Sequence, residues 1–132
     1  RKQNSLFSEQ LILVQADAQF LPFADNTFDT VVACLVFCTI SDPFLALQEL
    51  QRVLKPDGFL LALEHVRIKN SWVSALQDGL TPLWKHLAGG CHLNRDTVSL
   101  IRKAGFQIQY FSSYGGGLFV KLKAQSGGAL VC

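Results

Sequence analysis

The sequence has no methionine among its 132 residues, the initiator included, and it begins with Arg1-Lys2. It also has little excess charge: 12 basic and 10 acidic residues leave a net charge of +2, and the basic residues are scattered. No apolar run approaches the ~18 residues of a membrane-spanning helix, and nothing at the N-terminus is typical of a signal peptide. We therefore expect a fragment of a longer protein, without a nucleic-acid partner, because nucleic-acid binding needs clustered Lys and Arg.

The cysteines lack the CxxC spacing of structural metal sites. They stand at positions 34, 38, 91 and 132. A zinc site built from Cys34, Cys38, Cys91 and His92 is disfavoured, because tetrahedral sites usually use tighter ligand pairs. We expect free thiols and no bound metal. Free thiols favour a reducing compartment, so the expected location is intracellular, either cytoplasmic or membrane-associated.

What the sequence does have is 49% apolar residues, enough for the core of one domain, and two apolar runs around a long loop. Residues 11–14 and 30–37 are each typical of a buried strand. Asp17 stands where the first strand would end, and residues 21–23, Leu-Pro-Phe, form an extended turn. Because ligands bind at the carboxyl ends of strands in open α/β sheets, Asp17 is a candidate binding residue.

A helix and a further strand follow this loop. Asp42 is a good N-cap and Pro43 suits the first helical position. Residues 56–58, Pro-Asp-Gly, predict a turn that ends the helix, and residues 59–65 predict a third buried strand. The helix is therefore expected to be a crossover between parallel strands.

The second half of the chain predicts more helices and a hairpin. Residues 71–87 show near-helical apolar spacing, but Gly79 and Pro82 interrupt it, so two short helices with a break are expected. Asn94 is the expected cap of a further helix, closed by Gly105.

The C-terminal region alternates like a hairpin. Residues 106–111 and 118–123 flank a glycine-rich turn and predict two antiparallel strands. Residues 126–132 have the composition of a flexible tail. We accordingly assign residues 1–125 to one domain.

These motifs resemble the class I methyltransferases that use S-adenosylmethionine, in the ubiquinone/menaquinone-biosynthesis-like branch. In that branch an acid closes the third strand, as Asp17 does, and Leu-Pro-Phe leads to Phe-Asp, here Phe28-Asp29. The branch also has a turn of leucine, a basic residue, proline, any residue and glycine, here residues 54–58. The resemblance covers roughly residues 13–106.

Within the branch, the chain is most similar to membrane-associated methyltransferase-like proteins that include alkyl thiol methyltransferases. The shared motifs are Leu-Val-x-Cys at residues 35–38, Glu-His-Val at residues 64–66 and Gly-Cys-x-Leu at residues 90–93.

The resemblance implies the C-terminal portion of a Rossmann-like α/β fold, with a mostly parallel sheet and an antiparallel terminal hairpin. The first two strands are missing, since no glycine-rich loop precedes Asp17. In the family's strand order those strands lie between strands three and four. Either residues 11–14 therefore pair directly with residues 31–37, or that edge stays open and the chain self-associates through it.

The resemblance also implies cofactor contacts. Asp17 would accept a hydrogen bond from the adenine amino group while the Ala18 amide reaches the ring, and Cys34 and Leu35 would pass beneath the methionine portion. Two alternatives stay open: Asp17 could merely cap a turn, and Cys34 could be a core residue. Cys38 stands where many relatives have a histidine, and it could face the methyl acceptor.

Further residues are candidates for the acceptor side. His65 could orient or deprotonate the acceptor, or it could simply be hydrogen-bonded. Cys91 and His92 could line the pocket. Residues 72–84 could form a lid over a lipophilic substrate, contact a membrane surface, or pack in the core.

The predicted function is S-adenosylmethionine-dependent methyl transfer to a small or lipophilic acceptor, a thiol, quinone or lipid-like molecule, in the intact protein. The fragment alone is expected to be inactive. Such transfer asks little of side chains, because the cofactor carries the activated group. The alternative is a non-catalytic module that acts in protein association. A nicotinamide-dependent oxidoreductase fits worse, since it has no counterpart of the Leu-Pro-Phe loop or the terminal hairpin.

Overall fold

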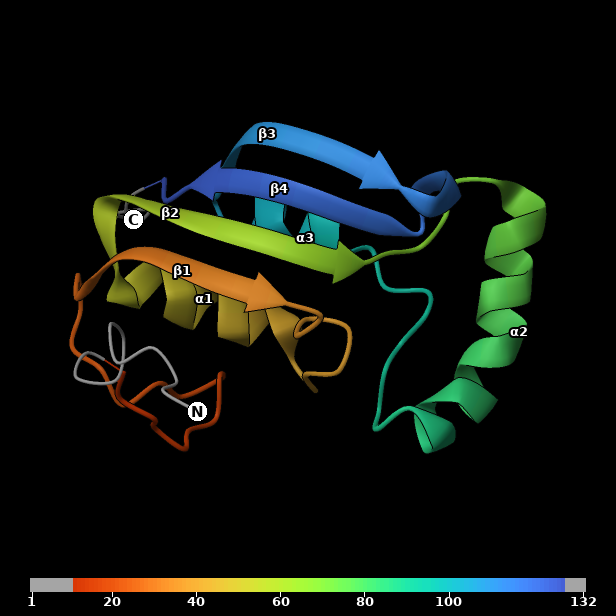
Figure 1. The fold of residues 1–132 in the computed structure, drawn as a ribbon, viewed down its shortest axis with the longest axis horizontal. Coiled ribbons are helices and arrows are strands. Elements are labelled where there is room, and N and C mark those ends of the chain that lie inside the picture. The colour runs from red at the N-terminus through yellow and green to blue at the C-terminus, as the bar shows by residue number, and fades with distance from the viewer. Residues whose placement is uncertain (1–10, 128–132) are drawn as a thin grey trace, which may run out of the picture.

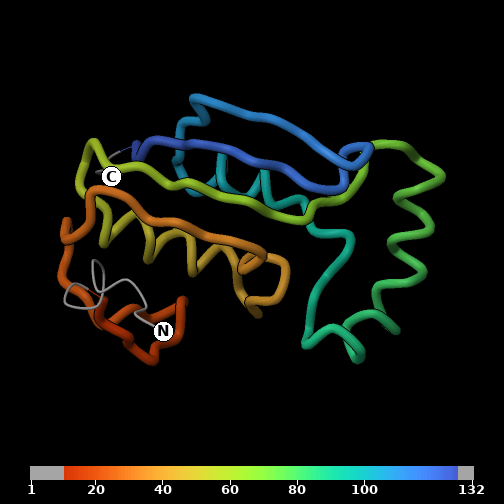
Figure 2. The backbone as a smooth tube through the Cα atoms, in the orientation of Figure 1, coloured from red at the N-terminus to blue at the C-terminus, as the bar shows by residue number. Residues whose placement is uncertain are grey.

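The computed structural model describes residues 11–127. They form one four-stranded sheet, with α-helices on one of its faces and one helix beyond the ends of two strands (Figure 1). In chain order the elements are β1 (Phe28–Cys34), α1 (Pro43–Val53), β2 (Leu54–His65), α2 (Ser71–Leu87), α3 (Thr97–Lys103), β3 (Gln107–Tyr114) and β4 (Phe119–Gln125). A short 3-10 turn, Gly115–Gly117, joins the last two strands. The backbone trace shows α2 standing beyond the carboxyl ends of β1 and β2 (Figure 2).

The sheet is mixed, with the strand order β1-β2-β4-β3. β1 and β2 are parallel and connected through α1, whereas β4 runs antiparallel to both of its neighbours. The predicted crossover helix and terminal hairpin are therefore confirmed. So is the partial Rossmann-like α/β fold.

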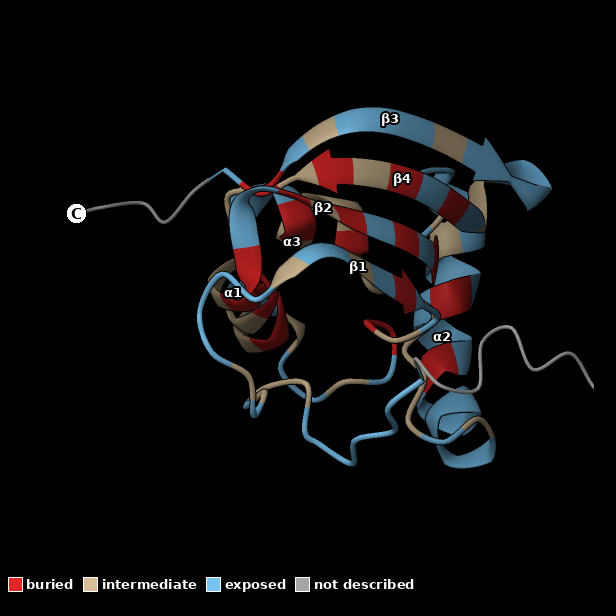
Figure 3. Cartoon of the chain, turned by 60° about the vertical axis from the view of Figure 1, so that its left-hand side comes forward, coloured by how far each residue is buried: buried red, intermediate tan, exposed pale blue. Residues whose placement is uncertain are grey.

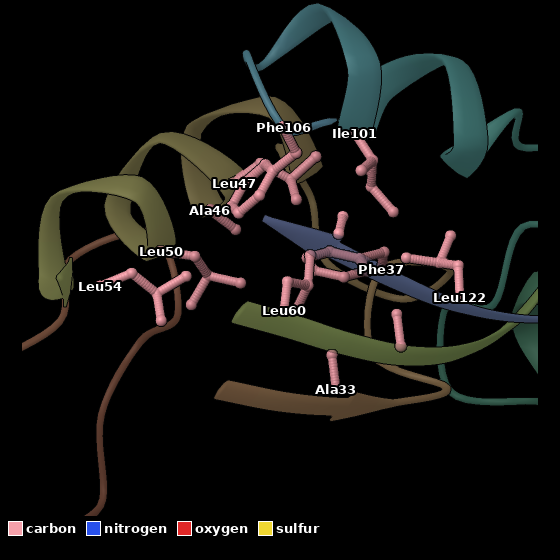
Figure 4. Packing of buried hydrophobic residues seen from close by; sticks show 12 residues of the cluster. Ala33, Phe37, Ala46, Leu47, Leu50, Leu54, Leu60, Ile101, Phe106 and Leu122 are labelled. Carbon is pink, nitrogen blue, oxygen red and sulfur yellow. The ribbon is translucent and has the colours of Figure 1, made fainter. Parts of the chain in front are cut away.

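The core lies between the sheet and the two helices α1 and α3. Leu47 and Leu50 of α1, Ile101 of α3 and Leu60 of β2 meet there (Figure 4). Burial alternates along β2, as expected for a strand with one covered face (Figure 3). The core therefore fixes which face of each strand points toward the helices.

The opposite face of the sheet is left bare among the described residues. Val32 is 71% exposed, and its neighbours Leu61 and Leu63 on β2 are also exposed. These side chains alternate with the buried Ala33 and Ala62. One side of β1 and β2 thus presents apolar surface to solvent.

Helix α1 begins as predicted. The Asp42 carboxylate accepts a hydrogen bond from the Leu45 amide at 3.0 Å, and Pro43 occupies the first turn, where its missing N–H costs nothing. Its buried residues recur at helical spacing. They are Ala46, Leu47, Leu50 and Val53.

The strand predicted at residues 11–14 is wrong. These residues have no regular structure, and Leu13 is 88% exposed. An apolar run becomes a buried strand only when its backbone groups pair with a neighbour, and the free edge of β1 does not supply that pairing. Of the two arrangements considered above, the described residues show the open edge.

The predicted break in residues 71–87 is also wrong, because α2 is one helix with Pro82 inside it. Proline removes a single amide donor, and two side-chain contacts with backbone carbonyls lie close to it in the helix. The Thr81 hydroxyl donates to the Gln77 carbonyl at 2.6 Å, and Nδ1 of His86 lies 2.7 Å from the Pro82 carbonyl oxygen.

The cap of α3 is Asp96, not Asn94 as predicted. The Asp96 carboxylate accepts from the Ser99 amide at 3.1 Å and from its hydroxyl at 2.6 Å. Asn94 instead donates to Asp78 of α2 at 2.9 Å. Either side chain has the chemistry of a cap, so the choice depends on where the chain turns. Gly105, with φ of +93°, follows α3 as expected.

The predicted turn at residues 56–58 is absorbed into β2 as an irregularity. Pairing jumps from Phe28 opposite Leu54 to Thr30 opposite Phe59. A Cβ on Gly58 would lie 2.9 Å from the Lys55 carbonyl oxygen, so only glycine fits there.

The C-terminal end of the described residues is bonded to this irregular part of β2. The Ser126 amide donates to the Gly58 carbonyl at 2.8 Å, and its hydroxyl donates to Gln51 at 2.7 Å. Ser126 is buried, although it was assigned to the tail. The rest of the predicted tail, residues 128–132, lies outside the described residues.

No helix within residues 11–127 combines the length and the apolar character needed to cross a bilayer.

We predict that Leu47→Ala lowers the free energy of unfolding by about 2–5 kcal/mol, because it removes a fully buried side chain from the core. Leu76→Ala is the matched control, since Leu76 is exposed on α2 and its loss should change stability by less than about 0.5 kcal/mol. Urea unfolding followed by circular dichroism measures both. Equal effects would contradict the assigned core.

Candidate functional site

The parallel pairing of β1 and β2 brings their carboxyl ends to one edge of the sheet, so Cys34 and Leu35 lie beside the end of β2 (Figure 1). The Leu35 amide donates to the Leu63 carbonyl at 2.8 Å. Leu35 has a φ of +55°, in the left-handed region that a leucine rarely adopts. The chain therefore turns sharply as it leaves β1, and such strained positions cluster at binding sites.

A buried carboxylate holds the chain after this turn. Oε1 of Glu64, at the end of β2, accepts hydrogen bonds from the amides of Val36 at 2.9 Å and Phe37 at 3.3 Å. Glu64 is fully buried, and burial raises its pKa while the amide hydrogen bonds oppose the rise. Its Oε2 has no hydrogen-bond partner among the described residues.

Arg95 holds the same segment from its carbonyl side. Its guanidinium donates to the carbonyls of Phe37 at 2.6 Å and Ile40 at 2.7 Å. We call residues 36–40 the β1 loop. Glu64 accepts from its amides and Arg95 donates to its carbonyls, so charged groups fix both sides of the loop.

Sequence reasoning missed both of these residues. It named Glu64 only as part of the Glu-His-Val motif, and it did not single out Arg95. The available signal was an acid inside an otherwise apolar strand, because such an acid needs an internal partner.

His65, a predicted catalytic residue, is 8% exposed at the end of β2. Its Nδ1 has no hydrogen-bond partner among the described residues, and its ring meets the edge of Phe119 at a centroid distance of 5.6 Å. Burial lowers the pKa of His65, so the imidazole is neutral at pH 7. A neutral imidazole can accept a proton.

Cys38, the second predicted catalytic residue, is buried within the β1 loop. Its thiol donates to the Leu35 carbonyl at 3.5 Å, and burial is the main reason that its pKa is raised to about 12. The group stays protonated at neutral pH, so it is not a base there. The His92 amide donates to the Cys38 carbonyl at 2.8 Å. The structure thus brings Cys38 together with the segment of Cys91 and His92, and the pocket role of these residues stays a prediction.

Asp17 and Ala18, the predicted adenine contacts, form an exposed turn. The Asp17 carboxylate accepts from the Gln19 amide at 2.9 Å, and its carbonyl accepts from the Phe20 amide at 3.0 Å. Asp17 therefore does cap a turn, and its exposed carboxylate also accepts from the Gln19 side-chain amide at 3.2 Å on each oxygen. Gln19 accepts from the Asp42 amide at 3.0 Å, which ties the turn to the start of α1.

The Leu-Pro-Phe segment is clamped by α1. Glu49 accepts from the Leu21 amide at 2.8 Å, while Arg52 donates to the carbonyls of Leu21 at 3.0 Å and Phe23 at 2.8 Å. The pKa of Glu49 is lowered, with its hydrogen bond to Arg52 as the largest cause. Arg52 also pairs with Asp25 at 2.8 Å. The loop before β1 is therefore positioned by a helix that follows β1.

The apolar residues predicted to form a lid, a membrane contact or core do not pack into the core among the described residues. Trp72 is 86% exposed, and Leu83 and Trp84 are exposed too. Residues 11–127 contain no group of three side chains that could hold a metal ion.

Comparison with known proteins identifies the family of this chain. Residues 1–62 match the model of a methyltransferase domain. Thiol S-methyltransferase TMT1B of Rattus norvegicus is 48% identical over 84 residues, which are 63% of this chain and 34% of that protein. The ubiquinone/menaquinone biosynthesis C-methyltransferase UbiE of Teredinibacter turnerae is 35% identical over 121 residues, covering 77% of this chain and 49% of that protein.

Solved structures show the same fold. A SAM-dependent methyltransferase of Thermotoga maritima aligns with a TM-score of 0.66 at 23% identity, over 90% of this chain and 66% of that chain. The [4+2]-cyclase SpnF aligns with the same TM-score of 0.66 at 19% identity, over 86% of this chain and 55% of that one. The fold alone therefore does not give the reaction.

Taken with the strand order and the motifs, these matches show that the chain belongs to the class I S-adenosylmethionine-dependent methyltransferases. The chain spans about a third of the rat protein and about half of the bacterial one.

We predict that Glu64→Gln and Glu64→Leu separate the charge of this residue from its hydrogen bonds. The folded-state pKa is raised, so Glu64 contributes stability that is present below about pH 4.3, the unfolded value, and is lost as the pH rises through the folded value. Glu64→Gln keeps an acceptor without the charge, so its stability relative to the wild type should increase over that window.

Glu64→Leu leaves the Val36 and Phe37 amides without their acceptor and should cost about 1–3 kcal/mol. Chemical unfolding from pH 3 to pH 8 measures both variants. A constant difference between Glu64→Gln and the wild type at every pH would contradict the burial of an ionisable carboxyl.

Proposed function

We propose that the protein to which this chain belongs transfers the methyl group of S-adenosylmethionine to the sulfur of a small lipophilic thiol. The observation that carries the proposal is the shared carboxyl end of β1 and β2, where Glu64 holds the β1 loop and the next residue of β2 is the neutral, buried His65. The choice of a thiol is supported by the 48% identity to the rat thiol S-methyltransferase.

The described residues fit parts of this cofactor. The Asp17 carboxylate is exposed and can accept from the adenine amino group, with the Ala18 amide beside it. Cys34 and Leu35 turn at the strand end, where the backbone can pass beneath the methionine portion. The cofactor supplies a sulfonium-activated methyl group, so the protein's part is alignment and the exclusion of water.

His65 is assigned the proton in this proposal. A thiol with an ordinary pKa of about 8.5 is mostly protonated at pH 7, and the thiolate is the nucleophile. The imidazole would accept the thiol proton as the acceptor sulfur bonds to the methyl carbon. The bond between that carbon and the sulfonium would break, and S-adenosylhomocysteine would leave. Cys38 has a buried, protonated thiol, which suits packing against an apolar acceptor rather than proton transfer.

We further propose that the 132-residue chain does not turn over by itself, since it spans 34% of the rat relative. Its activity is therefore best tested in a chimera that places the preceding residues of the rat thiol S-methyltransferase in front of the aligned segment.

In that chimera, Asp17→Ala should raise the dissociation constant for S-adenosylmethionine about tenfold, the effect of losing one hydrogen bond to a charged group. Asp57→Ala is the matched control, because Asp57 is an exposed acid in the bulge of β2 and should leave binding unchanged. Calorimetric titration measures both.

His65→Phe in the same chimera should lower kcat for an alkyl thiol by about 100-fold or more, with cofactor binding retained. The loss should shrink as the pH approaches the pKa of the acceptor thiol, because the thiolate no longer needs a base. A chimera that binds the cofactor but methylates no thiol would overturn the proposed acceptor.

A second candidate function, association through the sheet, is favoured by the outer edge of β1, with which no residue of the range 11–127 pairs as a strand. Exposed strand edges pair with other chains. We predict that the isolated chain self-associates and that Val32→Lys shifts it toward monomer, because a charged side chain blunts an edge strand. Val73→Lys, at an exposed position on α2, is the control. Light scattering that shows a monodisperse wild-type monomer would count against this function.

A further inference from the structure

Two cysteines that are far apart in the sequence lie next to each other. Cys38 belongs to the β1 loop, and Cys91 lies between α2 and α3. The His92 amide donates to the Cys38 carbonyl at 2.8 Å, and a Cβ on Gly90 would lie 3.8 Å from the Thr39 carbonyl oxygen. Residues 90–92 therefore run against residues 38–39.

The Cys38 and Cys91 thiols are close enough to interact. Burial is the largest cause of the raised pKa of Cys38, and the Cys91 thiol is the next largest. The Arg95 guanidinium, whose pKa is lowered mainly by burial, donates to the Phe37 and Ile40 carbonyls of the β1 loop. Backbone hydrogen bonds and this arginine therefore join the two segments that carry the cysteines.

The two sulfurs differ in their access to solvent. Cys38 is buried, whereas Cys91 is of intermediate exposure. An oxidant in solution therefore reaches Cys91 first, and Cys38 is the protected thiol within reach of the product.

We propose that Cys38 and Cys91 are a disulfide-forming pair, oxidised by a peroxide. The Cys91 thiolate attacks one peroxide oxygen, the O–O bond breaks, and the products are a sulfenic acid and, after protonation, water. The Cys38 sulfur then attacks the Cys91 sulfur. The S–O bond breaks, and the released hydroxide takes the Cys38 proton to give a second water. The two thiols supply the two electrons that reduce the peroxide.

The bond joins two segments that carry different parts of the site. It would fasten the β1 loop, whose amides are held by Glu64, to the connection that presents His92 and Arg95. Oxidation would thereby fix the β1 loop covalently, and reduction would leave it to the hydrogen bonds alone. This modification does not depend on which acceptor the enzyme uses.

Cys34 provides an internal control, because it is exposed at the end of β1 and lies only four positions before Cys38. Trypsin cleaves after Lys2 and Arg52, so both cysteines fall in one peptide, while Cys91 falls in the peptide 86–95. A Cys34→Ser variant is therefore needed to assign the cross-link.

The experiment treats the reduced 132-residue chain with hydrogen peroxide, blocks the remaining thiols by alkylation, and maps the tryptic peptides by mass spectrometry. We expect the peptide 86–95 to be linked within one chain to the peptide that contains Cys38, with the loss of two hydrogens, and the link to persist in Cys34→Ser. The link to Cys91 should form in about tenfold higher yield in Cys34→Ser than in Cys38→Ser, because the fold brings only Cys38 close to Cys91. In urea this preference should disappear.

Cys91→Ser should abolish the cross-link and leave Cys38 slow to alkylate until the chain is unfolded. The oxidised wild type should also unfold at a higher urea concentration than the reduced form, because a disulfide restricts the unfolded chain. Two results would overturn the proposal. One is a native chain in which Cys91 links to Cys34 in preference to Cys38. The other is a native chain whose Cys38 and Cys91 thiols are still free after the peroxide has been consumed by other groups.

Discussion

The rest of this site depends on one interaction: the buried Glu64 side chain accepts hydrogen bonds from two backbone amides. It spans the two parallel strands at their carboxyl ends and holds the chain just after the left-handed Leu35. A buried carboxyl without such donors would be costly, so the strand and the β1 loop stabilise each other. The loop is therefore an inherent part of the sheet edge rather than an appendage to it.

Similar logic positions the other loops. Arg95 donates to carbonyls of the β1 loop, and Glu49 with Arg52 binds both the amide and the carbonyls of the Leu-Pro-Phe segment. In each case a charged side chain from a later element fixes a loop from an earlier one. The edge that faces the proposed cofactor is thus assembled by contacts between residues far apart in the sequence.

The sequence predicted the elements whose stability is local or whose burial is complete. The α1 cap at Asp42, the crossover and the terminal hairpin were all correct, because caps, period and turn residues agree there. The strand predicted at residues 11–14 was wrong because an apolar run indicates only that its side chains favour burial. Strand formation also needs a pairing partner, which other segments must supply. The break predicted at Pro82 was wrong because the helix tolerates the loss of a single amide donor.

The site was predictable in outline only. Its location at the strand ends followed from the fold, so His65, Cys34 and Leu35 fall where expected. The residues that hold it, Glu64 and Arg95, could not be assigned, because their partners are backbone groups that carry no sequence signature. Asp17 forms its own turn, and its proposed role requires the exposed carboxylate to exchange a hydrogen bond from the Gln19 side chain for one from the adenine amino group.

One face of the sheet is left uncovered by the described residues, and this has a consequence for how the chain interacts with other polypeptides. Val32, Leu61 and Leu63 form an exposed apolar surface beside the edge of β1 that no described residue pairs with, while α1 and α3 pack on the other face. Covering such a surface yields roughly 25 cal/mol for each Å² of apolar surface removed from water. The described residues therefore pack a core on one face of the sheet and leave an apolar surface on the other. A complementary polypeptide can fold against that surface.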